Sequence, residues 1–308
     1  MQLDKIYHGD AYSVLETFDN ESVDCIITSP PYWQLRSYGD GEEIGQEIEC
    51  DLYISHLFSI FAQAHRVLKS DGTFWLNIGD TYSGWGGGNK SSGKERYTDF
   101  TFRKPLFNLP KKSLMNIPSR VSIGLQDMSW VLRNEIIWHK PNAMPNSVKD
   151  RFTVDFEKIY FFTKKSSGYY FNQQMEPMVS SDKTSLRSSR GVVDQLNSGR
   201  REKKTDNSFS NNLGFGTMMR NKRTTWHIPT ESRSIEHFAT FPMELVETCI
   251  EAGCKPNGVV LDMFVGSGTT AIVAKSLGRH YIGIDKNEKY VKLAEKRLKT
   301  TQTTMFAY

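Results

Sequence analysis

Residues 259–271 read V-V-L-D-M-F-V-G-S-G-T-T-A, an apolar run that leads into a glycine-rich turn. This pattern predicts a buried strand, a tight turn and then a helix. Small residues at such a turn allow a ligand to approach the backbone and the amino terminus of the helix. A helix that merely packs closely on a sheet produces the same pattern, so the residues that follow have to decide between the two.

Asp285 favours the ligand. It ends the next predicted strand and comes 19 residues after Gly266. A carboxylate about 20 residues after the first glycine is typical of sites that bind ribose hydroxyls. No lysine follows Gly268, which excludes a phosphate-binding P-loop. The sequence therefore predicts a site for a ligand that contains a ribose.

A second stretch, T-S-P-P-Y-W at residues 28–33, follows the apolar run at 23–27 that predicts another strand. Its two consecutive prolines fix φ and remove two backbone donors, so the strand ends in a rigid turn. The turn carries a hydroxyl, carbonyl acceptors and two aromatic rings, which suit a flat ring that bears an amino group. The alternative is an ordinary strand exit with Tyr32 and Trp33 packed into the core.

Predicted strands and helices alternate along most of the chain, which indicates an α/β fold with a mostly parallel sheet and helices on both faces. Strands are expected at 5–8, 22–28, 73–78, 131–139, 156–163, 258–262 and 281–285, with Asp71-Gly72 as a turn before the third. Helices are expected after Asp10 and at 51–69, 118–128, 242–252, 269–277 and 289–298. Residues 79–112 are expected to form a long loop, and 173–225 lack any regular apolar period.

Composition sets wider bounds. The 308 residues are 38% hydrophobic and 12% aromatic, and no apolar stretch approaches the length of about 18 residues that a membrane span needs. The amino terminus does not resemble a secretory signal. The four cysteines are scattered without metal-binding spacing. We expect a cytoplasmic protein without a metal site or membrane association.

Positive charge is concentrated in two segments. Residues 180–225 hold ten Lys or Arg against four acidic residues, although the net charge of the whole chain is only +4. Residues 80–112 hold seven basic and three acidic residues. Basic segments on an otherwise acidic body predict contact with a polyanion, the alternative being solvated loops.

Three functions compete on these observations. A nicotinamide-dependent dehydrogenase explains the glycine turn and Asp285, but its fingerprint normally begins the domain, whereas this chain ends 23 residues after Asp285. A non-catalytic nucleic-acid-binding protein explains the basic segments and has no need of a ribose site. The third function uses both stretches together, which requires the final strands to pack beside the first ones.

The two stretches, in this order, resemble those of the beta class of amino-methylating DNA methyltransferases. Further matches include Gly9-Asp10, W-H-K-P-N at 138–142 and H-F-A-T-F-P at 237–242, and they cover almost the whole chain outside 173–225. The resemblance implies a circularly permuted Rossmann-like fold. It also implies a catalytic part at 1–172, a target-recognition region at 173–225 and a cofactor-binding part at 226–308.

The resemblance also implies roles for single residues. The catalytic turn is Ser29, Pro30, Pro31 and Tyr32, where the Ser29 hydroxyl and the Pro30 carbonyl accept amine hydrogens and Tyr32 stacks on a flipped base. S-adenosylmethionine is the implied cofactor, with contacts from Asp10, Asp262, Phe264, Gly266, Gly268, Thr269, Asp285 and His237. Asp262 has the alternative of fixing the glycine turn, and His237 that of a structural residue.

Duplex DNA is the implied substrate. Its expected contacts are Trp33 and the basic residues Arg187, Arg190, Arg200, Arg201, Lys203, Lys204, Arg220, Lys222 and Arg223. Serine at the first position of the four-residue motif is typical of enzymes that methylate N4 of cytosine, whereas N6-adenine enzymes usually carry Asp or Asn. The expectation is therefore an N4-cytosine methyltransferase of a restriction-modification system with a cognate endonuclease, the alternative being N6-adenine methylation.

Overall fold

The computed structural model describes residues 1–35, 43–84, 109–178, 219–231 and 242–301. The chain divides into a larger unit, residues 1–172 with 224–308, and a smaller one, residues 173–223. In the smaller unit the described residues form one antiparallel pair, β6 (Met175–Pro177) with β7 (Met219–Asn221). The Arg220 and Arg223 side chains both pair with Glu176 across this ladder.

The larger unit is built on an eight-stranded sheet with the order β1-β10-β9-β2-β3-β5-β4-β8. The strands are β1 (Lys5–His8), β2 (Val23–Thr28), β3 (Leu68–Ile78), β4 (Val131–His139), β5 (Phe156–Thr163), β8 (Thr225–His227), β9 (Val259–Asp262) and β10 (His280–Asp285). Only β5 runs antiparallel to its neighbours. The expected mostly parallel sheet is confirmed, and β1 lies beside β10 as the third function requires.

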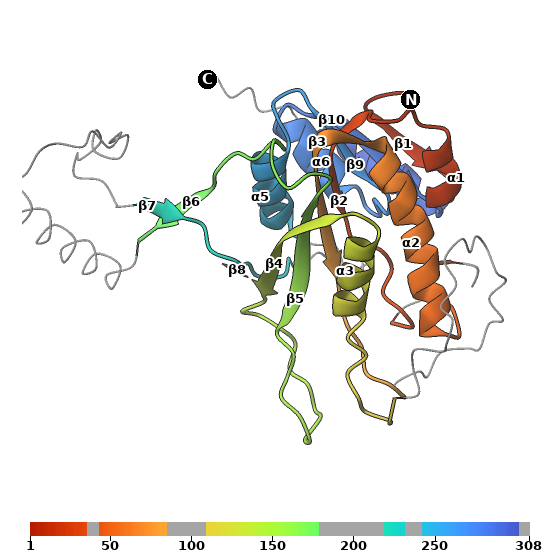
Figure 1. Ribbon diagram of the computed structural model, residues 1–308, viewed down its shortest axis with the longest axis vertical. Coiled ribbons are helices and arrows are strands. Elements are labelled where there is room, and N and C mark those ends of the chain that lie inside the picture. Colours follow the sequence, from red (N-terminus) through yellow and green to blue (C-terminus); the bar gives the residue numbers. More distant parts are fainter. Residues whose placement is uncertain (36–42, 85–108, 179–218, 232–241, 302–308) are drawn as a thin grey trace, which may run out of the picture. The chain divides into compact units, whose positions relative to one another are not determined.

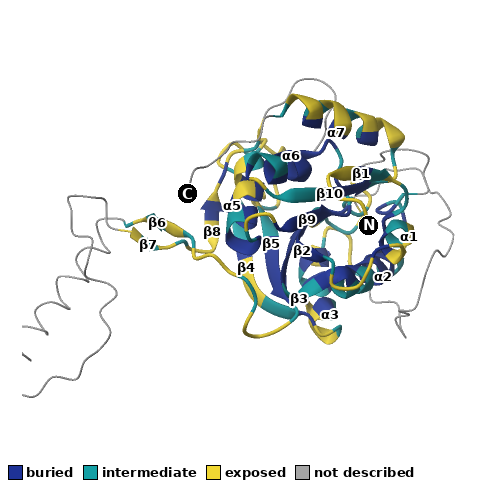
Figure 2. Ribbon diagram, turned by 90° about the horizontal axis from the view of Figure 1, so that it is seen from above, coloured by how far each residue is buried: buried dark blue, intermediate teal, exposed yellow. Residues whose placement is uncertain are grey.

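Helices cover both faces of this sheet (Figure 2). One face carries α1 (Ala11–Glu16), α2 (Cys50–Val67) and α3 (Ile117–Asp127). The other carries α5 (Met243–Gly253) and α6 (Thr269–Ser276), with α7 (Glu288–Thr300) beside α6. None of the helices in the described ranges is long and apolar enough to cross a membrane.

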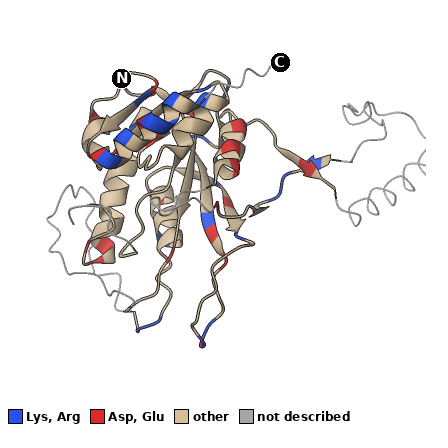
Figure 3. Cartoon of the chain, turned by 180° about the vertical axis from the view of Figure 1, so that it is seen from behind, with Lys and Arg blue, Asp and Glu red and all other residues tan. Residues whose placement is uncertain are grey.

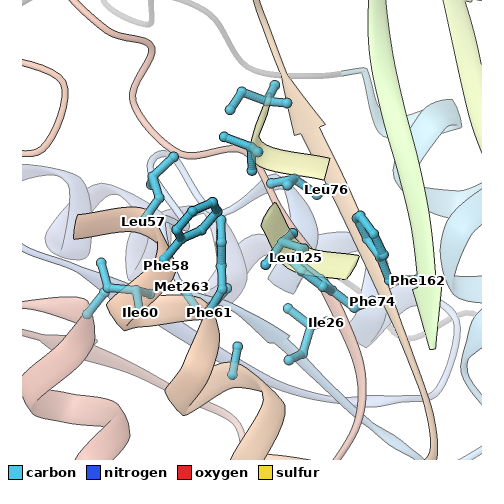
Figure 4. Packing of buried hydrophobic residues seen from close by; sticks show 14 of the residues in the cluster. Ile26, Leu57, Phe58, Ile60, Phe61, Phe74, Leu76, Leu125, Phe162 and Met263 are labelled. Atoms are coloured by element: carbon cyan, nitrogen blue, oxygen red, sulfur yellow. The ribbon is translucent and has the colours of Figure 1, made fainter. Parts of the chain in front are cut away.

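Alternation along β3 divides the core between the two faces. Phe74 packs under α2, where its ring centroid lies 5.5 Å from that of Phe61 and 5.8 Å from that of Phe162 (Figure 4). The next residue, Trp75, points to the opposite face and stacks on Phe161 with centroids 4.2 Å apart. This period of two, with both faces buried, explains why the end of the strand, Phe74–Ile78, is apolar apart from Asn77.

The prediction of a turn at Asp71-Gly72 is wrong, because both residues lie within β3. β3 starts earlier, at Leu68, and its register against β2 shifts between Val23 and Cys25. The extra residues of β3 in this interval form an irregularity within the strand, and β3 pairs in parallel with β2 on both sides of it. Gly72 is required there because an added Cβ would lie 2.8 Å from the Asp24 backbone carbonyl oxygen.

Candidate active site

The two signature stretches meet at one edge of the sheet. β2 pairs in parallel with β9, placing Cys25 opposite Val260 and Ile26 opposite Leu261, so both strands end at the same level. The side chains beyond this pairing are in contact, because Thr28 Oγ1 donates to Asp262 Oδ1 over 2.6 Å. The expectation that the final strands bring the glycine turn beside the S-P-P-Y turn is confirmed.

The Ser29 hydroxyl lies in a polar network. Ser29 Oγ is 3.3 Å from Asn77 Oδ1 and 3.4 Å from Tyr32 Oη. Asn77 is buried, and its amide nitrogen donates to Glu157 Oε2 over 3.1 Å and to the Lys158 carbonyl. Because the nitrogen faces two acceptors, the amide oxygen faces Ser29 and accepts its hydrogen. The lone pairs of Ser29 Oγ are thereby left as acceptors.

Glu157 holds the network together through both of its carboxylate oxygens. Its Oε2 accepts from Tyr32 Oη over 2.7 Å, and its Oε1 pairs with the Lys140 ammonium group, both side chains being largely buried. Lys140 in turn lies over the Trp138 ring, 4.4 Å from its centroid. Burial and the neighbouring Glu157 charge raise the pKa of Tyr32 well above its ordinary value. Tyr32 is therefore a hydroxyl donor to Glu157 and not a phenolate.

The position of the Tyr32 ring is set by its packing. A Cβ added to Gly79 would lie 2.4 Å from Tyr32 Cε2, so one side of the ring rests on backbone that only glycine permits. The following turn is held by Tyr53 Oη, which donates to the Pro31 carbonyl over 2.9 Å. Trp33 packs against the main core and donates from Nε1 to the Glu47 carbonyl over 2.8 Å.

Asp262 joins the two halves of the site. Its Oδ1 accepts from Thr28 Oγ1 and from the Phe264 amide, and its Oδ2 accepts from Thr270 Oγ1 over 2.6 Å. The side chain is 2% exposed. Burial, which outweighs these hydrogen bonds, raises the pKa of Asp262 to about 6. Of the two roles expected for Asp262, these contacts fit the fixing of the glycine turn.

The raised pKa predicts how Asp262 changes stability with pH. The folded-state value lies above the unfolded one, so the stability of the protonated form is present below about pH 4 and is lost as the pH rises to about 6. The rise of the Asp262 pKa from 3.8 to about 6 corresponds to on the order of 3 kcal/mol of stability. Asp262→Asn should remove this loss. The free energy of unfolding of Asp262→Asn should therefore rise relative to that of the unsubstituted protein as the pH increases from 4 to 7.

Urea unfolding at pH 4, 5, 6 and 7 measures this difference. Asp24→Asn is the control, because burial of this carboxylate is outweighed by hydrogen bonds from the Val259 amide, Lys69 and Lys255, which lower its pKa. Its contribution to stability is present above the unfolded pKa of about 4 and is lost only at lower pH, so the gap between Asp24→Asn and the unsubstituted protein should change little from pH 4 to 7. A gap between Asp262→Asn and the unsubstituted protein that stays constant with pH would contradict the prediction.

The two glycines of the turn have different structural reasons. Gly266 has φ +51°, and a Cβ added there would meet no atom within 4 Å, so the turn opens to space at this residue. Gly268 has φ +88°, and its Cβ would lie 2.8 Å from Ala294 Cβ, so it permits the close approach of α6 and α7. Arg297 donates to the Ser267 carbonyl over 2.6 Å and holds the turn from α7.

The other residues expected to hold a ligand lie around this turn. Asp285 accepts from the Gly266 amide over 2.9 Å and from the Asn287 amide over 2.8 Å. Burial raises its pKa. Thr269 begins α6, and its hydroxyl oxygen is buried without a hydrogen-bond partner among the described residues. Asp10 follows β1, beside β10, and caps α1 through the Ser13 amide.

Several expected site residues lie outside the described residues. They are His237, Arg187, Arg190, Arg200, Arg201, Lys203 and Lys204. Of the three remaining basic residues of the predicted insertion, Arg220 and Arg223 form the pairs with Glu176 given above, and the backbone amide of Lys222 donates to the Gln174 carbonyl. In the described part of the chain, no three His, Cys, Asp or Glu side chains are grouped to hold a metal ion.

Sequence reasoning missed three members of the network. Asn77 comes from β3, Glu157 from the antiparallel β5 and Lys140 from the residue after β4. A signal was available for Asn77, a polar residue within the otherwise apolar run F-W-L-N-I. Such a residue in a buried strand needs partners, and those partners are commonly part of a site.

Comparison with known proteins agrees with this arrangement. A family model described as DNA methylase matches residues 23–296. The Type II methyltransferase M.Cfr9I of Citrobacter freundii is 39% identical over 302 residues, which cover 97% of this chain and 89% of that protein.

Two solved structures share the fold. The PvuII DNA methyltransferase (cytosine-N4-specific) matches with a TM-score of 0.63 and 19% identity, over 96% of this chain and 86% of that one. The M1.HpyAVI–SAM complex matches with a TM-score of 0.53 and 20% identity, over 96% and 98% of the two chains. Both therefore support the Rossmann-like methyltransferase fold of the sheet.

Proposed function

This chain belongs to the DNA methylase family, and we propose that it transfers a methyl group from S-adenosylmethionine to the N4 amine of a flipped cytosine in duplex DNA. The observation that carries the choice of base is Ser29 at the first position of the S-P-P-Y turn, with its hydroxyl hydrogen directed to Asn77. A neutral acceptor suits an amine that has hydrogens to donate, and the ring acceptors of cytosine gain nothing from a fixed anion at this place.

The catalytic contribution of the turn is positioning. The exocyclic amine is a poor nucleophile because its lone pair is delocalised into the ring. Ser29 Oγ and the Pro30 carbonyl accept its two hydrogens, which draws the nitrogen toward tetrahedral geometry and directs its lone pair. Tyr32, held by Glu157 and Gly79, offers its ring to the base. Glu157 already binds Tyr32, Asn77 and Lys140, so the amine proton leaves to water.

The glycine turn fits the proposed cofactor. The open space at Gly266 admits a ligand against the backbone, and the buried Thr269 hydroxyl supplies an unused polar atom at the start of α6. Asp285 would hold the ribose and Asp10 the adenine amine, with Phe264 beside the methionine portion. When bound, S-adenosylmethionine supplies a methyl group that its sulfonium already activates.

The partners follow from the same proposal. The basic segment within 173–225, most of which lies outside the described residues, serves as a target-recognition region that contacts DNA phosphates. A restriction endonuclease of the same specificity is the expected partner protein, because relatives such as M.Cfr9I are named Type II methyltransferases.

Product analysis tests the choice of base. DNA from a host that expresses the chain is digested to nucleosides, which are weighed by mass spectrometry. We expect N4-methylcytosine, and sequencing of the same DNA with detection of modified bases maps the recognition site. Methylation of adenine alone would overturn the cytosine assignment and favour the N6-adenine alternative, which the same fold accommodates with few changes in the pocket. DNA without any added methyl group would overturn both.

A further inference from the structure

The loop that joins β4 to β5, residues 140–155, exposes large apolar side chains. Phe152 is 96% exposed and Met144 is 87% exposed, and the next large apolar side chain among the described residues, Ile123, is only 58% exposed. A single exposed apolar residue needs no explanation. Two extreme cases on one loop make the exposure a property of that loop.

The loop stands at the edge of the sheet that carries Ser29. β2 is parallel to β3, and β5 is antiparallel to both β3 and β4. β4 therefore runs in the same direction as β2, and the two strands end at the same edge of the sheet. The base of the loop is tied, because the Lys140 amide donates to the Asp155 carbonyl over 2.7 Å. Asn142 exchanges hydrogen bonds of 2.9 and 2.8 Å with the Thr230 backbone. The remainder projects away from the sheet (Figure 1).

Basic residues gather where this loop meets a second one. Lys112, in the described end of the loop between β3 and α3, pairs with Asp150 over 2.6 Å. The Arg151 guanidinium lies 3.8 Å from the centroid of the Tyr82 ring, at the other end of that second loop. Among the described residues where the two loops meet, the cations are Lys111, Lys112, Lys149 and Arg151, and Asp150 is the carboxylate that pairs with one of them. Figure 3 shows Lys and Arg in blue at the ends of both loops.

Exposed apolar side chains on the two arms of a loop that also carries cations match duplex DNA better than they match an apolar protein surface. Phosphates attract the cations, and the stacked bases accept an apolar ring. Phe152 lies three residues from Asp155, so its backbone can stand up to about 10 Å from the tied base of the loop, whereas the major groove is about 8.5 Å deep. The ring is therefore able to reach the base pairs, and the neighbouring Lys149 and Arg151 are available to the phosphates that line the groove.

We propose that the 140–155 loop enters a groove of the target duplex and that Phe152 inserts into the base stack beside the flipped target. This inference rests on the proposed function, because it requires a duplex substrate with a flipped base. Phe152 would fill space that the target base leaves and so lower the free-energy cost of keeping that base out of the helix.

The test uses a duplex that holds the recognition site mapped above, with 2-aminopurine next to the target base. Fluorescence anisotropy measures its affinity for the full chain, and the rise in 2-aminopurine emission reports unstacking at the target. Phe152→Ala should weaken binding by roughly 5- to 150-fold, the range for loss of one aromatic–base stack, and should abolish most of the rise in emission at saturating protein. Phe152→Trp should retain both. Ile123→Ala, on the solvent side of α3, is the matched control and should change neither.

Methylation of the same duplex by the unsubstituted protein is measured first, and its absence would overturn the proposed function together with this inference. Normal methylation combined with unchanged affinity for Phe152→Ala would overturn the insertion alone. Weaker binding with a full rise in emission would also overturn it, since Phe152 would then touch the duplex without entering the stack.

Discussion

Ser29→Ala is expected to lower the turnover of methyl transfer by about 10²- to 10³-fold, the loss typical of removing one group that stabilises charge in a transition state. The hydroxyl hydrogen is directed to Asn77, so the substitution removes an acceptor lone pair from the reacting amine and little else. Since that contact matters chiefly in the transition state, affinity for S-adenosylmethionine and for DNA should change little.

Single-turnover kinetics with labelled cofactor, at saturating DNA, measures the effect. Ser22→Ala is a matched control, because Ser22 precedes the same strand at its other end and its hydroxyl donates to the Asp19 carbonyl over 2.7 Å. It should leave the rate unchanged. A Ser29→Ala protein that keeps more than a tenth of the rate would exclude Ser29 from the proposed role.

Asp285→Ala is expected to weaken binding of S-adenosylmethionine severely. A lost hydrogen bond to a charged group costs about 1.5–3 kcal/mol, which corresponds to roughly 10- to 150-fold in affinity. The same carboxylate accepts from the Gly266 amide, so its removal also loosens the turn on which the cofactor would rest. Both effects act in the same direction.

Titration calorimetry in the absence of DNA separates this effect from catalysis. Asp4→Ala is the control, because Asp4 accepts from the Tyr281 amide at the opposite end of the same strand, β10. It should not change cofactor affinity. If Asp285→Ala binds as tightly as the unsubstituted protein, Asp285 does not belong to the cofactor site.

The local part of the fold could be predicted from the sequence, and the pairing of distant strands only in part. The glycine turn and the S-P-P-Y turn each announce a strand through neighbouring residues, so their strands were found within a residue or two. The prediction of a turn at Asp71-Gly72 was wrong because strand pairing on both sides of the irregularity outweighed the local turn preference of these residues. The three residues of β8 are too few to show a period.

The polar network behind Ser29 could not be predicted for a related reason. Asn77, Glu157 and Lys140 come together only because β5 is antiparallel between β3 and β4, and nothing in their own segments specifies that order. The hydrogen bond that links Asp262 to the first half of the site likewise comes from Thr28, which lies 234 residues away in sequence. Residue types indicated the chemistry, whereas the partners that orient each group followed from the topology.

The order of strands in the sheet also bears on how the chain is synthesised. β1 is made before every other strand of the sheet, yet its neighbour is β10, which ends at Asp285. At about 5–20 residues per second, roughly 15–55 s separate the translation of these two strands. β9 is translated almost as long after β2, and the edge of β2 that pairs with β9 stays unpaired until then. A chain that stops before residue 259 therefore exposes the edges of β1 and β2 that β10 and β9 otherwise cover, and such edges are open to pairing with other chains.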